Sequence, residues 1–86
     1  MNTQTKKWSF TWDTNVKQKT LPNEVKLMNF LNRETDLSCF QYELGEIKKK
    51  EHIQGMITLA GERKSKRSVL ELFKETFKNV DGLTIQ

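Results

Sequence analysis

The fold of this chain is decided between residues 37 and 60, which read LSCFQYELGEIKKKEHIQGMITLA. Apolar and polar side chains alternate from Leu37 to Leu44 and again from His52 to Ala60, as in strands that bury one face. The charged segment from Gly45 to Glu51 lies between them and is short enough to be a turn. These residues therefore predict an antiparallel hairpin.

Side-chain parity assigns the hairpin residues to two faces, because successive side chains of a strand point in opposite directions. The predicted core face carries Phe40, Tyr42, Leu44, Ile53, Ile57 and Leu59. Glu43, His52 and Gln54 would then share the opposite face. In a hairpin that turns around residues 47–49, Glu43 falls opposite residues 52–54, where cross-strand neighbours lie roughly 5 Å apart.

A carboxylate, an imidazole and an amide oxygen at this spacing can hold one divalent cation. Three such ligands, mostly oxygen with a single nitrogen, suit Mg²⁺ or Mn²⁺ better than a closed zinc site. A simpler interpretation stays open on the residues alone. A histidine beside a carboxylate can be an ordinary hydrogen-bonded pair, and Gln54 can be an ordinary polar strand residue.

The segments on either side of the hairpin predict a strand and a helix before it. Residues 7–13 alternate with Trp8, Phe10 and Trp12 on one face, which predicts a strand, and residues 14–20 form a polar loop. Pro22 suits a first helical turn. An amphipathic helix ending near Arg33 is predicted by the apolar stripe of Val25, Leu27, Met28, Phe30 and Leu31.

A second helix and a closing strand are predicted after a basic connection over residues 61–67. Ser68 and Glu71 form a capping-box pattern. The helical stripe consists of Leu70, Phe73 and Phe77, with Lys74 and Lys78 in the last turn and Asp81-Gly82 as the stop. Residues 83–86 would close the sheet. The order predicts one α+β domain over residues 1–86: a ferredoxin-like βαββαβ sandwich, with an antiparallel sheet packed on helices.

The composition limits both the core and the cellular setting. Only 35% of the 86 residues are hydrophobic, so the core must be thin. There is no apolar run of membrane-spanning length and no signal-like apolar start, which predicts neither a membrane nor a secreted protein. The single cysteine, Cys39, is expected to be a buried reduced thiol, and the compartment a reducing one such as cytosol or nucleus.

The charge distribution favours a polyanionic partner. Fifteen Lys and Arg against eleven Asp and Glu give a net charge of +4. The basic residues cluster in two runs, at residues 48–50 and 63–67. Trp8 and Trp12 could stack on bases, but the face that they share with Phe10 favours a place in the core.

Residues 42–55, YELGEIKKKEHIQG, resemble the second motif of the replication-initiator proteins of small circular single-stranded DNA viruses, such as circoviruses and nanoviruses. In these HUH endonucleases the motif is a His, an apolar residue and a Gln or His. A Glu lies eight or nine residues upstream, and Glu43 is nine residues before His52. The first motif, an aromatic-Thr strand, is similar to residues 8–12, WSFTW. The similarity covers nearly the whole chain.

The resemblance implies that Glu43, His52 and Gln54 coordinate Mg²⁺ or Mn²⁺, which would polarise the scissile phosphate of single-stranded DNA at a replication origin. Glu46 is a rival carboxylate, less favoured because it breaks the parity. The residues expected to hold the DNA backbone are Lys6, Lys7, Lys48, Lys49, Lys50, Arg63, Lys64 and Arg67. The implied location is the host nucleus or cytoplasm, and a helicase domain could follow.

The chain departs from the family in its third motif, a Tyr followed three residues later by a Lys, whose Tyr is the nucleophile. The only tyrosine is Tyr42, which belongs by parity to the core face. The nucleophile is therefore expected after Gln86, and these 86 residues alone are expected not to nick DNA. Two alternatives stay open: a non-catalytic ferredoxin-like module for single-stranded nucleic acid, and a protein-interaction domain with no metal dependence.

Overall fold

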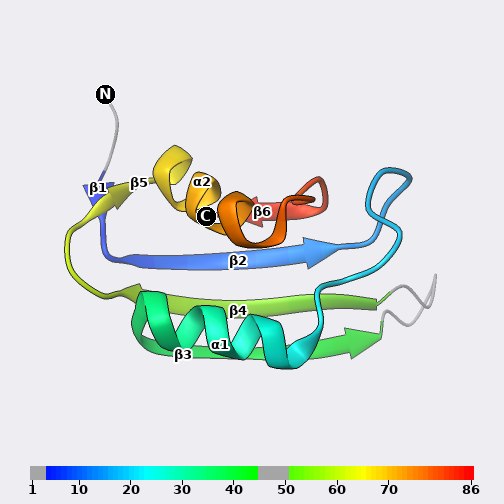
Figure 1. The fold of residues 1–86 in the computed structure, drawn as a ribbon, viewed down its shortest axis with the longest axis horizontal. Helices are drawn as coiled ribbons and strands as arrows, with labels where there is room; N and C mark the ends of the chain where they lie inside the picture. Colours follow the sequence, from blue (N-terminus) through cyan, green and yellow to red (C-terminus); the bar gives the residue numbers. More distant parts are fainter. Residues whose placement is uncertain (1–3, 45–50) are drawn as a thin grey trace.

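A four-stranded antiparallel sheet carries two helices on one side in the computed structural model, which describes residues 4–44 and 51–86 (Figure 1). The elements are β1 (Gln4–Thr5), β2 (Lys7–Asp13), α1 (Glu24–Glu34), β3 (Thr35–Leu44), β4 (Glu51–Leu59), β5 (Lys64–Ser65), α2 (Lys66–Phe77) and β6 (Leu83–Ile85). The large sheet has the order β3-β4-β2-β6. The predicted α+β arrangement, an antiparallel sheet packed on helices, is confirmed.

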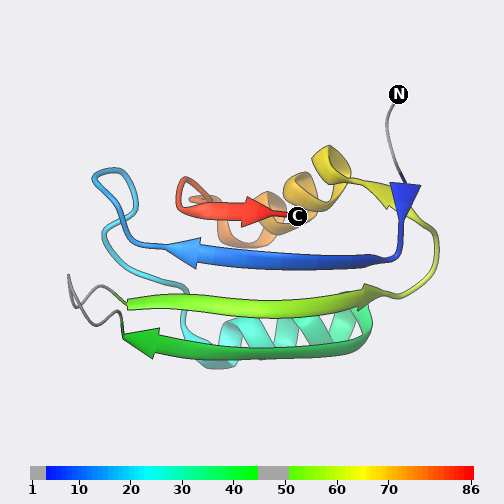
Figure 2. The same ribbon diagram turned by 180° about the vertical axis from the view of Figure 1, so that it is seen from behind.

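The predicted hairpin is present as β3 and β4, which pair antiparallel over almost their whole length. Strand β4 also pairs with β2, and β2 pairs with β6, so β4 and β2 are the central strands. The two helices lie on the same side of this sheet, and within residues 4–44 and 51–86 no element covers its other side (Figure 2). We call that uncovered side the open face.

Aromatic side chains from one strand and both helices form the centre of the core. Phe73 of α2 lies 4.7 Å from Phe30 of α1, 5.6 Å from Phe10 and 5.8 Å from Trp12, measured between ring centroids. Trp12 is completely buried, and Trp8 packs against the edge of the core. The parity of β2 is therefore as predicted, and neither tryptophan offers a platform for bases.

Helix α1 begins later than its sequence pattern predicts. Asn23 is the N-cap, and its side-chain oxygen accepts hydrogen bonds from the backbone N–H groups of Val25 and Lys26. Pro22 therefore precedes the cap and is not part of the first turn. Val25 and Met28 are exposed, because only the stripe through Leu27, Phe30 and Leu31 faces the sheet.

Helix α2 differs from its prediction at both ends. The predicted capping box at Ser68 is wrong, because Ser65 is the N-cap and its hydroxyl accepts from the N–H of Ser68. The helix ends at Phe77, where Lys78 adopts a positive φ of 67°. The turn at Asp81-Gly82 therefore follows the helix and does not stop it.

Part of the predicted basic connection is a small sheet that the sequence pattern did not reveal. Strands β1 and β5 pair antiparallel, with Gln4 opposite Ser65 and Thr5 opposite Lys64. Two-residue strands are too short to show an alternating pattern. The pairing ties the N-terminal segment to the start of α2.

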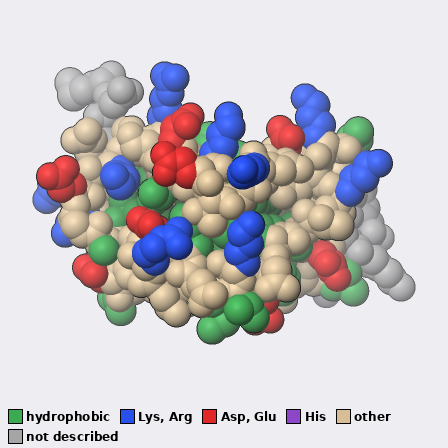
Figure 3. All heavy atoms as spheres, viewed as in Figure 1, with side chains coloured by type: hydrophobic (Ala, Val, Ile, Leu, Met, Phe, Trp, Pro, Cys, Tyr) green, Lys and Arg blue, Asp and Glu red, His purple; other side chains and the backbone are tan. Residues whose placement is uncertain are grey.

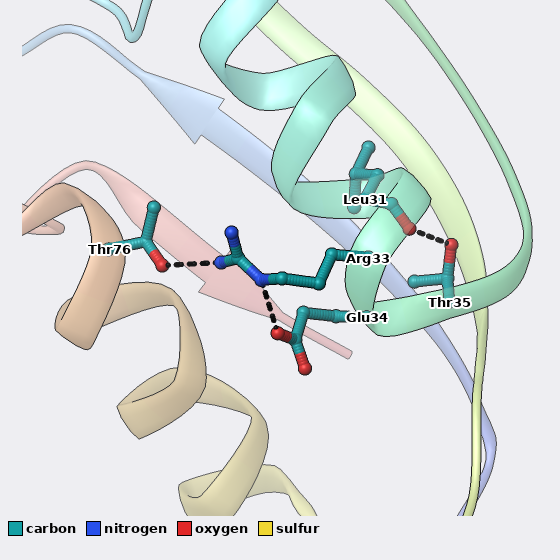
Figure 4. A network of polar contacts seen from close by, with 5 residues as sticks. All are labelled: Leu31, Arg33, Glu34, Thr35 and Thr76. Atoms are coloured by element: carbon teal, nitrogen blue, oxygen red, sulfur yellow. Dashed lines mark hydrogen bonds and ion pairs between the residues drawn. The ribbon is translucent and has the colours of Figure 1, made fainter.

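A polar contact joins the end of α1 to α2 (Figure 4). The guanidinium of Arg33 donates from Nη2 to the hydroxyl of Thr76 at 3.2 Å, and its Nε contacts the carboxylate of Glu34 at 2.8 Å. Thr35 closes the helix by donating its hydroxyl to the carbonyl of Leu31 at 2.6 Å. The contact of Arg33 with Thr76 links the two helices on the covered side of the sheet.

Neither helix of the described residues is long and apolar enough to cross a membrane.

Candidate functional site

Glu43 and His52 face each other across the β3–β4 pair on the open face. They are direct partners in the register, and the imidazole Nε2 lies 2.7 Å from the Oε2 of the carboxylate. The two side chains are partly buried, His52 being 25% and Glu43 34% exposed. The predicted cross-strand pairing of an acid with an imidazole is thus found in the structure, one pair from the end of the described β3–β4 register at Leu44 and Glu51.

Two glutamines form the next row of the same face. Gln54 lies two residues after His52 on β4, is exposed, and is the register partner of Gln41 on β3. The side-chain Nε2 of Gln41 donates a hydrogen bond to the Oε1 of Glu43. Gln41 was missed by the sequence analysis, although its position two residues before Glu43 places it on the same face.

Hydrogen bonding keeps Glu43 in its charged form. The amide of Gln41 and the imidazole of His52 both stabilise the carboxylate, and together they lower the pKa of Glu43 below its ordinary value. The carboxylate therefore carries a full negative charge in neutral solution. A cation ligand needs that charge, since a protonated carboxyl group has lost most of its affinity for a metal.

Asp13 extends the row of Glu43 and His52 onto the neighbouring strand. It is the register partner of His52 on β2 and is exposed. His52 therefore has an acidic residue opposite it on each side. Within residues 4–44 and 51–86, however, no three His, Cys, Asp or Glu side chains converge closely enough to hold a metal ion. A cation would need amide oxygen and water to complete its ligands.

The donor set fits a hard divalent cation of this kind. Mg²⁺ and Mn²⁺ are bound through one or two carboxylates and keep several waters, which an uncovered sheet face can supply. Glu43 and His52 are joined by a hydrogen bond between Oε2 and Nε2. A cation bound by both atoms would take the place of that hydrogen bond. Its affinity should fall in acid, because a carboxylate must be deprotonated to bind a metal.

A buried glutamine fixes the end of β2 and the loop that follows it. Gln18 is only 3% exposed, and its Oε1 accepts from the indole N–H of Trp12 and the backbone N–H of Gly82, both at 2.8 Å. A Cβ at Gly82 would lie 1.7 Å from the carbonyl oxygen of Asp13, so only glycine allows this approach. The polar loop predicted over residues 14–20 thus contains a buried hydrogen-bonding centre that supports Asp13.

Tyr42 points away from the candidate site. Its hydroxyl donates to the carbonyl oxygen of Pro22 at 2.6 Å, on the helix side of the sheet. Partial burial and the charges of Glu24 and Glu51 raise the pKa of Tyr42 above its ordinary value. The side chain is therefore held protonated and lies on the side of the sheet that its parity predicted. Its predicted place in the core is wrong, because Tyr42 is 37% exposed, and Leu44, predicted for the same core face, is 60% exposed.

Cys39 corrects an expectation from the sequence. The prediction of a buried thiol is wrong, because Cys39 is exposed. Its side chain has the parity of Gln41 and Glu43, and it lies opposite Met56 on the open face. The apolar residues around it in the sequence point to the other side of the sheet.

A shallow hollow of about 390 Å³ adjoins the two glutamines on the open face. Its lining includes Ser9, Thr11, Cys39, Gln41, Gln54 and Met56. Met56 is 64% exposed, and Leu37, farther along β3, is 71% exposed. The open face thus combines polar groups near the candidate site with apolar surface along the strands.

The predicted basic residues that the structure describes lie at the other end of the sheet. Lys6 and Lys7 stand at the corner between β1 and β2, beside Lys64, whose register partner is Thr5. Arg63 precedes β5, and Arg67 is in the first turn of α2. The remaining predicted residues, Lys48, Lys49 and Lys50, and the rival ligand Glu46, lie outside the described residues. On the helix-bearing face, basic and acidic side chains are interspersed (Figure 3).

Comparison of the chain with models of known protein families finds no family that matches, and comparison with curated proteins finds no similar sequence.

Proposed function

We propose that this chain binds single-stranded DNA at a divalent-cation site on the open face of its sheet. In this proposal it is the greater part of an initiator endonuclease of the HUH class, which nicks and rejoins origin DNA in rolling-circle replication. The observation that carries the proposal is the contact of Glu43 with His52, with Gln54 in the adjacent row of an uncovered sheet. The resemblance of residues 42–55 and 8–12 supports it.

Glu43, His52 and Gln54 would hold Mg²⁺ or Mn²⁺ together with water. When bound, the cation would neutralise and polarise a phosphate of the DNA strand. The chain's own residues bind and orient the DNA: the carboxylate supplies charge, and the uncovered strands leave room for a polynucleotide strand that runs along the sheet. Cleavage also needs a nucleophile, and Tyr42 is turned toward Pro22. The proposal therefore assigns cleavage to a tyrosine outside these 86 residues.

The test measures the binding of a fluorescent single-stranded oligonucleotide by anisotropy, with Mn²⁺ and with EDTA. We expect Mn²⁺ to tighten binding about tenfold, and His52→Ala to remove that gain. Thr58→Ala is the matched control, because Thr58 is on the same strand but near its other end. Equal binding in Mn²⁺ and EDTA would refute the cation site.

The runner-up is a non-catalytic module for single-stranded nucleic acid. It is favoured by the exposed Met56 and Leu37, which offer apolar contact to bases without any metal. In that case, Met56→Ala would weaken binding while EDTA would leave it unchanged. Binding that depends on both Met56 and Mn²⁺ would instead support the leading proposal.

A further inference from the structure

Glu43 is held by two different side chains, one on each carboxylate oxygen. Gln41 donates to Oε1 from two residues earlier on the same strand, and His52 contacts Oε2 from the neighbouring strand. An exposed glutamate normally samples several rotamers, and fixing them has an entropic cost. Here the contact to Gln41 restrains the carboxylate before any cation arrives.

The chemistry of the two groups fixes the orientation of the Gln41 amide. A charged carboxylate only accepts hydrogen bonds, so the NH₂ group and not the carbonyl of Gln41 must face it. An amide that presents N–H to the site cannot also offer its oxygen to a cation bound at Glu43. Gln41 is therefore suited to orient a ligand and not to be one.

Gln54 stands in a different relation to the same carboxylate. It is opposite Gln41 in the register, but among the described residues its side chain makes no hydrogen bond to Glu43 or His52. Its amide oxygen is thus not committed to the pair. The two side chains are chemically identical, so their different roles follow from their places in the sheet. Gln54 can be a cation ligand, and Gln41 orients the carboxylate of Glu43.

We infer that Gln41 is the positioning residue of the cation site, holding the Glu43 carboxylate so that its Oε2 and the Nε2 of His52 converge on one ion. This inference rests on the proposed cation site. Hydrogen-bond donors behind metal ligands orient the ligand, and their removal typically weakens metal affinity by about 10–100-fold. Because this site is partly exposed, we expect the lower end of that range.

The experiment compares Mn²⁺ binding by calorimetry in the unaltered chain, in Gln41→Met and in Gln86→Met. Methionine keeps the length of the side chain and removes the donor. Gln86 is the matched control because it is also exposed and lines the same hollow, beyond the reach of the β3–β4 pair. We expect Gln41→Met to weaken Mn²⁺ binding about tenfold and Gln86→Met to leave it unchanged.

Two further readouts separate positioning from a general loss of structure. The melting temperature without metal should change little, since both substitutions are on the surface and Gln41→Met removes only one exposed hydrogen bond. The electron spin-echo signal of bound Mn²⁺ should keep the imidazole nitrogen coupling of His52 in Gln41→Met, because the ligands themselves are intact. Loss of that coupling would overturn the inference.

The remaining outcomes are distinguishable. If the unaltered chain binds no Mn²⁺, the proposed cation site is wrong and this inference falls with it. If the unaltered chain binds Mn²⁺ and Gln41→Met binds it equally well, the cation site stands and the positioning role is wrong.

Discussion

At the scale of the residue, Gly55 explains part of the motif that follows His52. A Cβ added at Gly55 would lie 2.6 Å from the Cε1 of Phe10 and 2.7 Å from the carbonyl oxygen of Cys39. The side of β4 that carries Ile53 and Ile57 therefore has a gap at this position, and the ring of Phe10 fills it. Gly55 is thus required for the packing of the core, whereas the side chains of His52 and Gln54 lie on the open face.

Replacing Gly55 by alanine should therefore destabilise the fold. One obstacle is a core ring and the other is backbone, so neither can move freely, and overpacking of this kind costs about 1–3 kcal/mol. Urea denaturation of Gly55→Ala measures the loss in the free energy of unfolding. Adding Phe10→Leu should recover part of it by removing the ring, whereas a Gly55→Ala chain as stable as the unaltered one would contradict the packing argument.

Glu43 gives a second prediction at this scale, for pH. Its pKa is lowered from an ordinary value of 4.5, first by the hydrogen bond from Gln41 and then by that from His52. Because the folded pKa is below the unfolded one, the contribution of Glu43 to stability is complete above the unfolded pKa. It is lost as the pH falls through the folded pKa. Carbon NMR of the carboxyl group should show this low pKa, and Gln41→Met should raise it. Titration of Glu43 at or above 4.5 in the unaltered chain would disagree with the structure.

At the scale of the element, the alternation of apolar and polar residues predicted where strands lie and which side chains share a face. The strand over residues 7–13 was predicted with its observed ends, and the hairpin parity put Glu43 and His52 on one face. Periodicity could not show Gln18, because a polar loop residue carries no sign that it accepts a buried indole N–H. Nor could it show Asp13 opposite His52, since that register joins two strands that are far apart in the sequence and are not connected by a short turn.

The start of α2 gives a prediction for one element. The hydroxyl of Ser65 accepts from the N–H of Ser68 at 3.3 Å, so the helix is capped three residues before the pattern suggested. Ser65→Ala should cost about 1 kcal/mol of stability, the usual loss for an N-cap serine. Ser68→Ala should cost less, and the comparison by urea denaturation decides between the two caps. A larger loss of stability for Ser68→Ala than for Ser65→Ala would support the predicted capping box at Ser68 and contradict the N-cap at Ser65.

At the scale of the whole molecule, the candidate cation site and the described basic residues are far apart. Strand β4 runs from the site at His52 to its end at Leu59, and Arg63 follows just beyond. Seven residue steps at about 3.3 Å each give a separation of about 23 Å along the sheet. A single-stranded DNA that touches both ends must therefore run along the open face (Figure 2). By strand parity that face carries Met56 and Lys7.

The length of the oligonucleotide should consequently decide which residues matter. A stacked strand advances about 3.4 Å per nucleotide, so about seven nucleotides are needed to join the two ends. Lys7→Ala with Arg63→Ala should weaken binding of a 12-mer in the presence of Mn²⁺ and leave a 4-mer unaffected. Each lost phosphate contact should also reduce the slope of log affinity against log salt by about 0.7 for the 12-mer.

The charge-matched control combines Lys17→Ala with Lys74→Ala, two exposed lysines outside the sheet, and should leave the binding of both oligonucleotides unchanged. A 4-mer that binds as tightly as the 12-mer would show that the strand crosses the sheet at one end only, because the basic corner would then contribute nothing.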